Sequence, residues 1–330
     1  MPPSYEDPRR RLLERHNDNP LLTAHDWPYS VNTVFNCGAA QLPSGETLLL
    51  VRVEDCSGLS HLCAARSKDG VTDWKIDPEP TFNPDPKNHL EEFWGIEDPR
   101  IVWVDELDMF AITYTCFSQR GPGVSLALTK DFITFDRKGI VFPPEDKDAA
   151  LLPKRIDGRW AVIHRPVPGH QRAHIWISYS PDLRHWGDHK IILSARHGAW
   201  WDANKIGLSP PLVETPEGWL MLYHGVRMTP AGCIYRMGLA LMDLEDPSRC
   251  IRRCTKWIMG PEAEYERTGD VGGVIFPCGY TIRDDGDTMY LYYGAADTSI
   301  ALATGSVRKM LAWLKENSTS CEPAVDEPAS

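Results

Sequence analysis

Two adjacent carboxylates stand in the segment from Phe93 to Ile101, which reads Phe-Trp-Gly-Ile-Glu-Asp-Pro-Arg-Ile. The proline after Asp98 keeps that residue away from α-helical geometry. On a strand-like segment adjacent side chains point to opposite sides, so we expect one carboxylate to face a site while the other pairs elsewhere, for example with Arg100. A carboxyl group placed in this way could donate or accept a proton. An acidic structural turn is the alternative, and the segment alone favours it.

A second set of residues is cationic. Its members are Lys147 before an apolar run, Arg165 in His-Arg-Pro, Lys205 in Asn-Lys-Ile-Gly, and His224 in Tyr-His-Gly-Val. An acidic protein that directs several cations into one site is expected to bind an anion there. Taken singly, each cation could be a solvated surface charge, and His224 could be a hydrogen-bonded core histidine. Their similar positions in successive repeats favour the anion site.

Three further carboxylates, Asp297, Glu264 and Glu266, could serve as bases, as ligands of sugar hydroxyls or as structural partners, and the sequence does not rank these roles. The sequence contains no GxSxG elbow, Walker loop, HExxH motif or dinucleotide fingerprint in a strand-helix context. We therefore expect no metal. The nine cysteines are scattered without a CxxC rhythm, which predicts mostly buried free thiols rather than a disulfide framework or a zinc site.

The elements that must position these residues repeat along the chain. Each copy is an alternating strand followed by a Ser/Thr-x-Asp turn and an aromatic residue, and the three clear copies are 65–74, 128–135 and 179–186. Degenerate copies follow at 239–247 and 300–305. Successive copies lie about 50 to 62 residues apart, the span of a four-stranded blade with its loops.

This period predicts an all-β fold, a five-bladed β-propeller with short terminal helices, in which residues 1–316 form a single catalytic domain. Helices are expected at about 5–16 and 306–316, and a disordered tail at 317–330. Two β-sandwiches are the rival architecture, but they would not need one signature per blade. In a propeller, polar residues at the same point of successive blades converge on a central funnel.

Composition limits the class of protein. With 42% hydrophobic and 25% charged residues among 330, the chain can bury a sizeable core. A formal net charge of -11 disfavours binding to nucleic acid or to an anionic membrane surface. The amino-terminal residues contain no apolar signal-peptide region, and no stretch is long and apolar enough to span a bilayer, so we expect a cytoplasmic protein.

From about Asn32 to Asp297 the sequence resembles glycoside hydrolase family 130, the inverting β-mannoside phosphorylases and their hydrolytic relatives. The motifs that carry the resemblance are Phe35-Asn36-Cys37-Gly38-Ala39-Ala40, Arg52-Val53-Glu54, Gly95-Ile96-Glu97-Asp98-Pro99-Arg100, His164-Arg165-Pro166, Lys205-Ile206-Gly207, Gly218-Trp219-Leu220, Tyr223-His224-Gly225-Val226, Tyr265-Glu266, Phe276-Pro277-Cys278-Gly279 and Tyr293-Gly294-Ala295-Ala296-Asp297.

The resemblance implies a five-bladed propeller and assigns roles. Asp98 would be the general acid, acting through the mannose 3-hydroxyl as a proton relay. The residues expected to contact the mannose are Asn36, Cys37, Arg52 and Asp297. Those expected to hold phosphate are Lys147, Arg165, Lys205, His224 and Tyr235.

The implied reaction is a glycosyltransferase-type phosphorolysis. Inorganic phosphate, a co-substrate rather than a cofactor, would attack the anomeric carbon with inversion and give α-mannose 1-phosphate. Substrates would be β-1,4- or β-1,2-linked manno-oligosaccharides or mannosyl-N-acetylglucosamine. Linkage, acceptor and any homo-oligomer stay open.

Two alternatives remain. An inverting β-mannosidase would use Glu264, Glu266 or Asp297 as its base and would have little reason to keep cations. A non-catalytic glycan-binding propeller would keep aromatic residues but would not need an acid together with cations; the aromatic residues are Trp94, Trp200 and Trp201.

Overall fold

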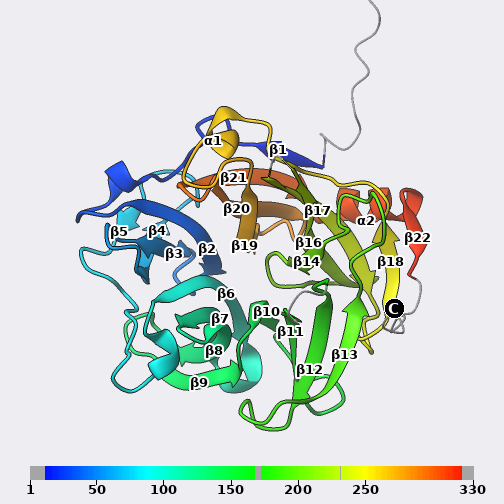
Figure 1. Cartoon of the computed structure of the whole chain (residues 1–330), viewed down its shortest axis with the longest axis horizontal. Coiled ribbons are helices and arrows are strands. Elements are labelled where there is room, and N and C mark those ends of the chain that lie inside the picture. The colour runs from blue at the N-terminus through cyan, green and yellow to red at the C-terminus, as the bar shows by residue number, and fades with distance from the viewer. Residues whose placement is uncertain (1–11, 168–171, 231, 322–330) are drawn as a thin grey trace, which may run out of the picture.

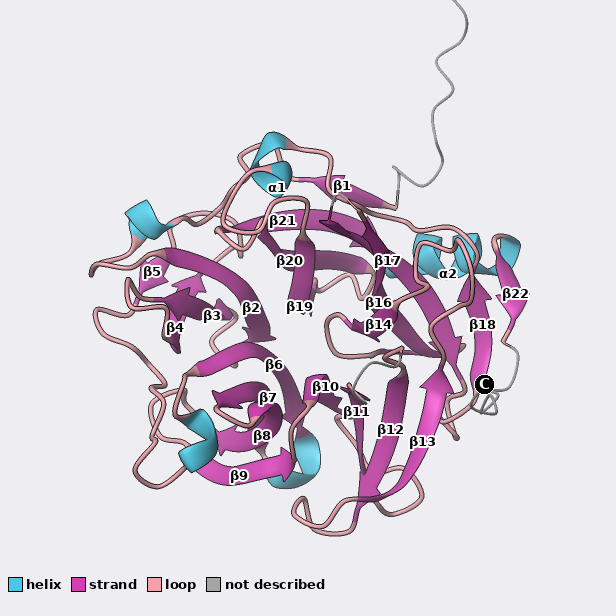
Figure 2. Ribbon diagram, in the orientation of Figure 1, coloured by secondary structure: helices cyan, strands magenta, loops and turns pink. Residues whose placement is uncertain are grey.

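The computed structural model describes residues 12–167, 172–230 and 232–321. These residues form five antiparallel sheets around a central axis, which confirms the prediction of an all-β, five-bladed β-propeller (Figures 1 and 2). One edge strand of each sheet lies nearest the axis, and these innermost strands contact one another across the blades. The core consists of apolar side chains packed between neighbouring sheets.

Within each blade the strands follow one another from the axis to the rim. The first blade is β2 (Thr33–Gln41), β3 (Thr47–Glu54), β4 (Ser60–Ser67) and β5 (Lys75–Ile76). The second is β6 (Ile96–Val104), β7 (Met109–Ser118), β8 (Gly121–Thr129) and β9 (Asp136–Phe142). The third is β10 (Asp146–Leu151), β11 (Trp160–Pro166), β12 (Ile175–Ser180) and β13 (Gly187–Leu193).

The last two blades recruit strands from elsewhere in the chain. The fourth is β14 (Lys205–Leu208), β16 (Gly218–Thr229), β17 (Gly232–Met242), β18 (Cys250–Cys254) and β22 (Ser318–Ser320), with β15 (Val213–Thr215) also paired to β16. The fifth is β19 (Ile275–Ile282), β20 (Thr288–Ala295), β21 (Ser299–Ser306) and β1 (Leu13–Arg15).

The repeated signature is the turn that ends the third strand of a blade. In the three clear copies an aspartate follows β4, β8 or β12, and one of its carboxylate oxygens accepts two backbone N–H groups at 2.8 or 2.9 Å; these aspartates are Asp69, Asp131 and Asp182. Asp243 does the same after β17, at 3.0 Å. An aspartate that satisfies the backbone donors of a turn explains why this residue recurs with the period of the blades.

The innermost strands of the first three blades share a bulge. The pairing register shifts between Phe35 and Gly38 in β2, between Glu97 and Arg100 in β6, and between Lys147 and Ala150 in β10. The bulged residues Asn36, Asp98 and Asp148 have φ angles of 45°, 50° and 54°. Asn and Asp tolerate this left-handed conformation better than other non-glycine residues. A bulge re-aims a side chain, so equivalent polar residues of successive blades turn toward the axis.

The predicted terminal segments need correction. Residues 5–11 of the expected amino-terminal helix lie outside the described residues, and Leu13–Arg15 form strand β1, paired with β21, rather than a helix. The reason is that β21 would otherwise leave an unpaired edge, which β1 covers while burying Leu13. The carboxy-terminal helix α2 runs from Val307 to Glu316, within the predicted range.

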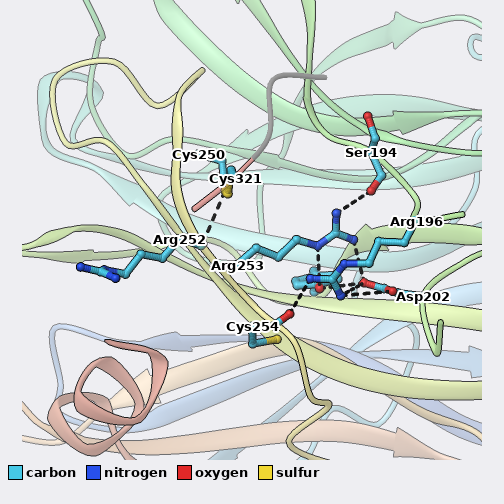
Figure 3. Close-up of a disulfide and its surroundings, with 9 residues drawn as sticks. Ser194, Arg196, Asp202, Cys250, Arg252, Arg253, Cys254 and Cys321 are labelled. Carbon is cyan, nitrogen blue, oxygen red and sulfur yellow. Dashed lines mark hydrogen bonds and ion pairs between the residues drawn. A yellow bond between two sulfur atoms is a disulfide. The ribbon is translucent and has the colours of Figure 1, made fainter. Parts of the chain in front are cut away.

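Residues 317–321 of the expected disordered tail are ordered, and residues 322–330 of it lie outside the described residues. Ser318–Ser320 form β22 on the outer edge of β18, and Cys321 forms a disulfide with Cys250, 71 residues earlier in the sequence (Figure 3). The sequence analysis expected mostly free thiols and did not anticipate this one disulfide, because the return of the tail to blade four was not visible in the spacing of the cysteines. Of the other cysteines, Cys56 and Cys233 are exposed, and the remaining five are buried free thiols.

The remaining helices of the described residues are short. They are α1 (Glu264–Arg267) and three 3-10 turns at Ala24–Asp26, Leu90–Glu92 and Asp105–Leu107. In the part of the chain that the structure describes, no helix has the length and apolar character needed to cross a membrane.

Candidate active site

Asp98 lies at the bulge of β6 and is 4% exposed. Its Oδ1 accepts hydrogen bonds from Asn36 Nδ2 at 2.9 Å and from Arg52 at 3.0 Å. Burial acts to raise the pKa of Asp98, but the charges of Arg52, Lys147 and Arg100 outweigh it, so the pKa lies below its ordinary value. The structure thus places the predicted acid, Asp98, in direct contact with two predicted sugar ligands, Asn36 and Arg52.

Glu97 does not point away from Asp98 as strict alternation would require. Its carboxylate contacts Arg52 at 3.2 Å and Lys147 Nζ at 3.1 Å, so both acidic residues share Arg52. The expected pair with Arg100 is not formed. The bulge between Glu97 and Arg100 breaks the two-residue period on which that expectation depended.

Arg100 instead joins blade two to blade four. Its buried guanidinium donates to the carbonyl oxygens of Ser209 at 2.7 Å, Leu208 at 2.9 Å and Asp98 at 3.1 Å. It also lies 3.4 Å from Asp148 Oδ1. An arginine with these fixed acceptors orients the strand that carries Asp98.

Asp148, at the bulge of β10, is a site residue that the sequence analysis missed. Its Oδ2 lies 2.8 Å from Arg165 Nε and 3.4 Å from His224 Nε2. Burial opposes its charge, but Arg165, His224 and Arg100 hold the pKa of Asp148 well below its usual range. A fixed negative charge therefore organises the predicted phosphate ligands from blades three and four. The signal that could have found Asp148 is its position in β10, which matches that of Asp98 in β6.

Lys147, the neighbour of Asp148, links the acidic and cationic groups. Although burial acts to lower it, the pKa of Lys147 is raised by Glu97 and Asp98. Lys205, from β14, makes no ion pair within the part of the chain described here, and its ammonium lies 5.8 Å from the ring centroid of Tyr235. Burial, followed by the charges of Arg165 and Lys147, lowers the pKa of Lys205. A bound anion would relieve this mutual repulsion of cations.

His224 and Tyr235 complete the cationic side of the site from the β16–β17 hairpin. The rings of His224 and Tyr235 lie 6.1 Å apart, and His224 also packs on Phe276 at 4.8 Å. Burial lowers the pKa of His224, while the neighbouring carboxylate of Asp148 acts to raise it. All five residues predicted to hold phosphate are thus brought together around Asp148 and Lys205.

Asp297 and Cys37 differ in their surroundings. Asp297 is half-buried, and burial together with the charge of Asp98 raises its pKa to about 6. It therefore belongs to the same electrostatic group as Asp98. The Cys37 side chain is fully buried among core residues such as Leu49 and Tyr292, which puts its thiol in the core rather than on the surface of the site.

Of the other candidate carboxylates, Glu266 is held in an ion pair and Glu264 lies on the surface. Glu266 is fully buried and binds Arg15 through both carboxylate oxygens, at 2.7 and 3.0 Å, and Tyr293 at 2.9 Å. Glu264 is exposed on α1, beside β1 at the rim (Figure 1). Trp201 is buried in the core, whereas Trp94 and Trp200 are exposed.

A Ser-His-Asp arrangement in blade three supports Arg165. His164 Nδ1 lies 2.6 Å from Asp146 Oδ2, and its Nε2 lies 2.7 Å from Ser178 Oγ. Ser178 is fully buried, so no substrate can reach it as a nucleophile. The second oxygen of Asp146 accepts the backbone N–H of Arg165 at 3.1 Å, which fixes the strand that carries the Arg165 side chain.

Comparison with known proteins agrees with this architecture. The model of glycoside hydrolase family 130, described as beta-1,4-mannooligosaccharide phosphorylase, matches residues 14–316. The chain is 36% identical to 1,2-beta-oligomannan phosphorylase of Thermoanaerobacter sp. (strain X514) over 88% of this chain and 96% of the relative. It is 32% identical to beta-1,4-mannooligosaccharide phosphorylase of Ruminococcus albus over 93% of this chain and 92% of the relative.

A solved structure is also similar. The beta-1,2-mannobiose phosphorylase from Listeria innocua, in complex with beta-1,2-mannobiose, superposes with a TM-score of 0.83 at 31% identity. The match covers 92% of this chain and 99% of that chain. Residues 14–316, which the family model matches, span all five blades and the positions of the candidate site.

Proposed function

Because the chain belongs to glycoside hydrolase family 130, we propose that it phosphorolyses β-mannosides with inversion and releases α-mannose 1-phosphate. Its relatives are β-mannoside phosphorylases, of both 1,2- and 1,4-linked substrates. The observation that carries the proposal is the group of cations around Asp148 directly beside Asp98. An acid next to a preformed anion site is what phosphorolysis needs.

In the proposed reaction phosphate binds among Lys147, Arg165 and Lys205, with His224 and Tyr235 as further ligands. This position orients its oxygen toward the anomeric carbon and converts the attack into an effectively unimolecular step. The bond from phosphate oxygen to the anomeric carbon forms as the glycosidic bond breaks, and the departing sugar receives a proton. Inversion follows because attack and departure occur on opposite faces.

Asp98 supplies that proton, acting through the mannose 3-hydroxyl, and Asn36, Arg52 and Asp297 bind the mannose. The contacts of Asn36 and Arg52 with the Asp98 carboxylate support a shared role in holding the sugar and the acid together. The transfer of a mannosyl group to phosphate makes the proposed enzyme a glycosyltransferase-type phosphorylase.

Hydrolysis by an inverting β-mannosidase is less well supported. Such an enzyme needs a carboxylate base about 6.5 to 9.5 Å from the acid. Glu266 is occupied by Arg15, and Glu264 lies on the exposed helix α1, so Asp297 is the one candidate of the three that belongs to the site. Lys205 has no carboxylate ion pair among the described residues, and hydrolysis does not require a cation at this position.

The test is to incubate the protein with β-1,2-mannobiose, β-1,4-mannobiose and mannosyl-N-acetylglucosamine, with and without phosphate. We expect α-mannose 1-phosphate, seen by phosphorus and proton NMR, in the presence of phosphate only. Mannose released at the same rate without phosphate would instead identify a mannosidase. The preferred substrate of the three gives the linkage and the acceptor.

Lys205→Ala offers a second test of the anion site. We expect the KM for phosphate to rise by about tenfold or more, with a smaller change in the KM for the mannoside, since one charge-assisted hydrogen bond to phosphate is lost. Lys190→Ala, an exposed lysine of β13, is the matched control. Unchanged phosphate dependence in Lys205→Ala would contradict the proposed site.

A further inference from the structure

A pocket of about 450 Å³ lies on the back of the β16–β17 hairpin. Its lining includes the tryptophans Trp200 and Trp257 and the cations Arg227, Arg236 and Lys256. Arg236 pairs with Gly225, whereas Tyr235 pairs with Val226. Because adjacent strand residues point to opposite faces, Arg227 and Arg236 face this pocket, while His224 and Tyr235 face the candidate active site. The pocket is thus separate from the anion site already described.

The floor of the pocket is built by a buried network. Trp201 packs closely against the hairpin, where a Cβ at Gly225 or Gly238 would meet its ring at 2.7 or 2.5 Å. The neighbouring Asp202 is fully buried and binds Arg196 at 3.1 Å and Arg253 at 2.7 Å (Figure 3). Two arginines on one buried carboxylate hold the loop that carries Trp200 and Trp201 in place. The pocket is therefore preformed.

The charge of the pocket is opposite to that of the protein. Arg227, Arg236 and Lys256 contribute three cations, and none of the described residues that line the pocket is Asp or Glu. The whole chain has a formal net charge of -11. A local positive potential of this kind attracts an anion. The guanidinium of Arg236 lies 4.8 Å from the centroid of the Trp257 ring, so cation and aromatic surface adjoin.

Trp200 supplies an exposed aromatic surface beside these cations; 44% of its area is accessible. Aromatic faces stack on the C–H faces of sugar rings, and arginines bind phosphate through paired N–H groups. The pocket volume lies within the range of about 300 to 1,000 Å³ typical of small-molecule sites. A ligand that carries both a sugar ring and a phosphate satisfies all of these features.

We propose that this pocket is a second ligand site, which binds a phosphorylated sugar. The phosphate is held by Arg227, Arg236 and Lys256, and the sugar ring packs on Trp200. The choice of α-mannose 1-phosphate as the first ligand to try rests on the proposed function, since it would be the product released at the neighbouring active site. The ligand class does not depend on that function.

The test is isothermal titration of the full-length protein with α-mannose 1-phosphate. If both the proposed function and the pocket site are correct, we expect two equivalents to bind per chain. The double variant Arg227→Ala/Lys256→Ala should lose one of them, with affinity for that site reduced by about tenfold or more. Its initial rate of phosphorolysis at low product concentration should be unchanged. Arg184→Ala/Lys190→Ala, two exposed cations of blade three, is the control with the same change in charge.

The outcomes separate the two proposals. If the protein does not phosphorolyse mannosides but one equivalent still binds and is lost in the double variant, the function is wrong and the pocket site stands. Stoichiometry and affinity unchanged in the double variant would overturn the site. Inorganic phosphate and β-mannobiose are titrated in parallel. Tighter binding of either of these than of the sugar phosphate at the site lost in the double variant would overturn the proposed ligand class.

Discussion

Asp98 and Asp297 are two neighbouring carboxyl groups whose pKa values shift in opposite directions. Cations lower that of Asp98, and burial with the charge of Asp98 raises that of Asp297 to about 6. An acid catalyst must hold a proton when the glycosidic bond breaks. Lys147, one of the cations that hold Asp98 ionised, is also a proposed phosphate ligand. Phosphate bound there would neutralise part of this charge, so Asp98 would take up its proton more easily once phosphate is present.

The loss of activity in Asp98→Asn should therefore depend on the leaving group of the substrate, whereas the loss in Asp297→Asn should not. We expect Asp98→Asn to lose about 10²- to 10⁴-fold in kcat/KM on mannobiose, as is usual when a general acid is removed. On a β-mannoside with an activated nitrophenol leaving group, which needs little protonation, the loss should be much smaller. Asp297→Asn, as a sugar-binding change, should reduce both rates similarly. Steady-state kinetics on the two substrates measures this difference.

Circular dichroism and thermal unfolding of both variants serve as the control for folding. An Asp98→Asn variant that lost equal activity on both substrates would contradict its role as proton donor. The reverse pattern, in which only Asp297→Asn is rescued by the activated leaving group, would move the role of acid to Asp297.

The raised pKa of Asp297 also predicts a pH-dependent stability. Its folded pKa of about 6 lies above the ordinary value of an aspartate, so the folded state binds the proton more tightly than the unfolded state. The stability that this group contributes is fully present below the unfolded pKa and is lost as pH rises through about 6. Asp297→Asn should therefore have little effect on Tm near pH 4 and should raise Tm relative to the natural protein at pH 7. A Tm difference between Asp297→Asn and the natural protein that does not change with pH would contradict the raised pKa of Asp297.

At the scale of single residues, the sequence could predict the groups that stand in recognisable motifs. Asp98, Arg165, Lys205 and His224 were found in this way and lie together in the structure. Asp148 was missed, because its role depends on a bulge and on neighbours from two other blades, and the one signal in the sequence is that its position in β10 matches that of Asp98 in β6. The wrong partner of Glu97 has the same origin, since a bulge is invisible in an alternating pattern.

At the scale of elements, the close approach of β14 and β16 fixes the positions of Lys205 and His224. Gly207 pairs with His224, and a Cβ at Gly207 would meet the His224 ring at 2.6 Å and would collide with Asp148 Oδ2. Only a residue without a side chain leaves room for the Asp148–His224 contact. The Lys-Ile-Gly motif of β14 thus combines one phosphate ligand with the space for another.

Gly207→Ala should therefore damage the anion site more than the fold. We expect the KM for phosphate to rise by about tenfold or more, because Asp148 and His224 must move apart, and Tm to fall by a few degrees. Phosphate-dependent kinetics and thermal unfolding measure the two effects. Gly187→Ala is the matched control, since a Cβ at Gly187 would meet no atom within 4 Å. Equal phosphate KM values in the two variants would show that the space at Gly207 is not required.

Four of the five blades were predictable because the aspartate turn after their third strand is a local structure with a recognisable sequence. In the fifth blade β21 instead runs directly into α2. The strands β1 and β22 were not predictable, because each pairs with a strand far away in the chain: Leu13 with Gly305, and Ser320 with Arg252. A three-residue segment carries too little periodicity to be recognised as a strand. Its structure comes from the open edge that it covers.

At the scale of the whole molecule, the ring is closed by β1, which adds an amino-terminal strand to the last blade (Figure 1). The Cys250–Cys321 disulfide ties the other end of the described chain to blade four. Disulfides persist mainly in oxidising compartments. The disulfide therefore does not favour the cytoplasmic location that the sequence predicts, and that location stays a prediction. Both ends are thus fixed to blades that neighbour each other around the ring.

Arg15 stabilises this closure of the ring, and removal of its side chain should destabilise the molecule strongly. Arg15 binds the fully buried Glu266 through two hydrogen bonds, of 2.7 and 3.0 Å, and its guanidinium also donates to the carbonyl of Gly260 at 2.7 Å. Arg15→Ala would leave a buried carboxylate without its counter-charge, a change that typically costs about 3 to 5 kcal/mol. Urea unfolding measures this loss. Lys130→Ala, which removes an exposed pair with Asp108 at 2.6 Å, should cost less than about 1 kcal/mol. Similar costs for the two variants would mean that β1 is held by backbone pairing and by burial of Leu13, and that the ion pair does not lock the ring.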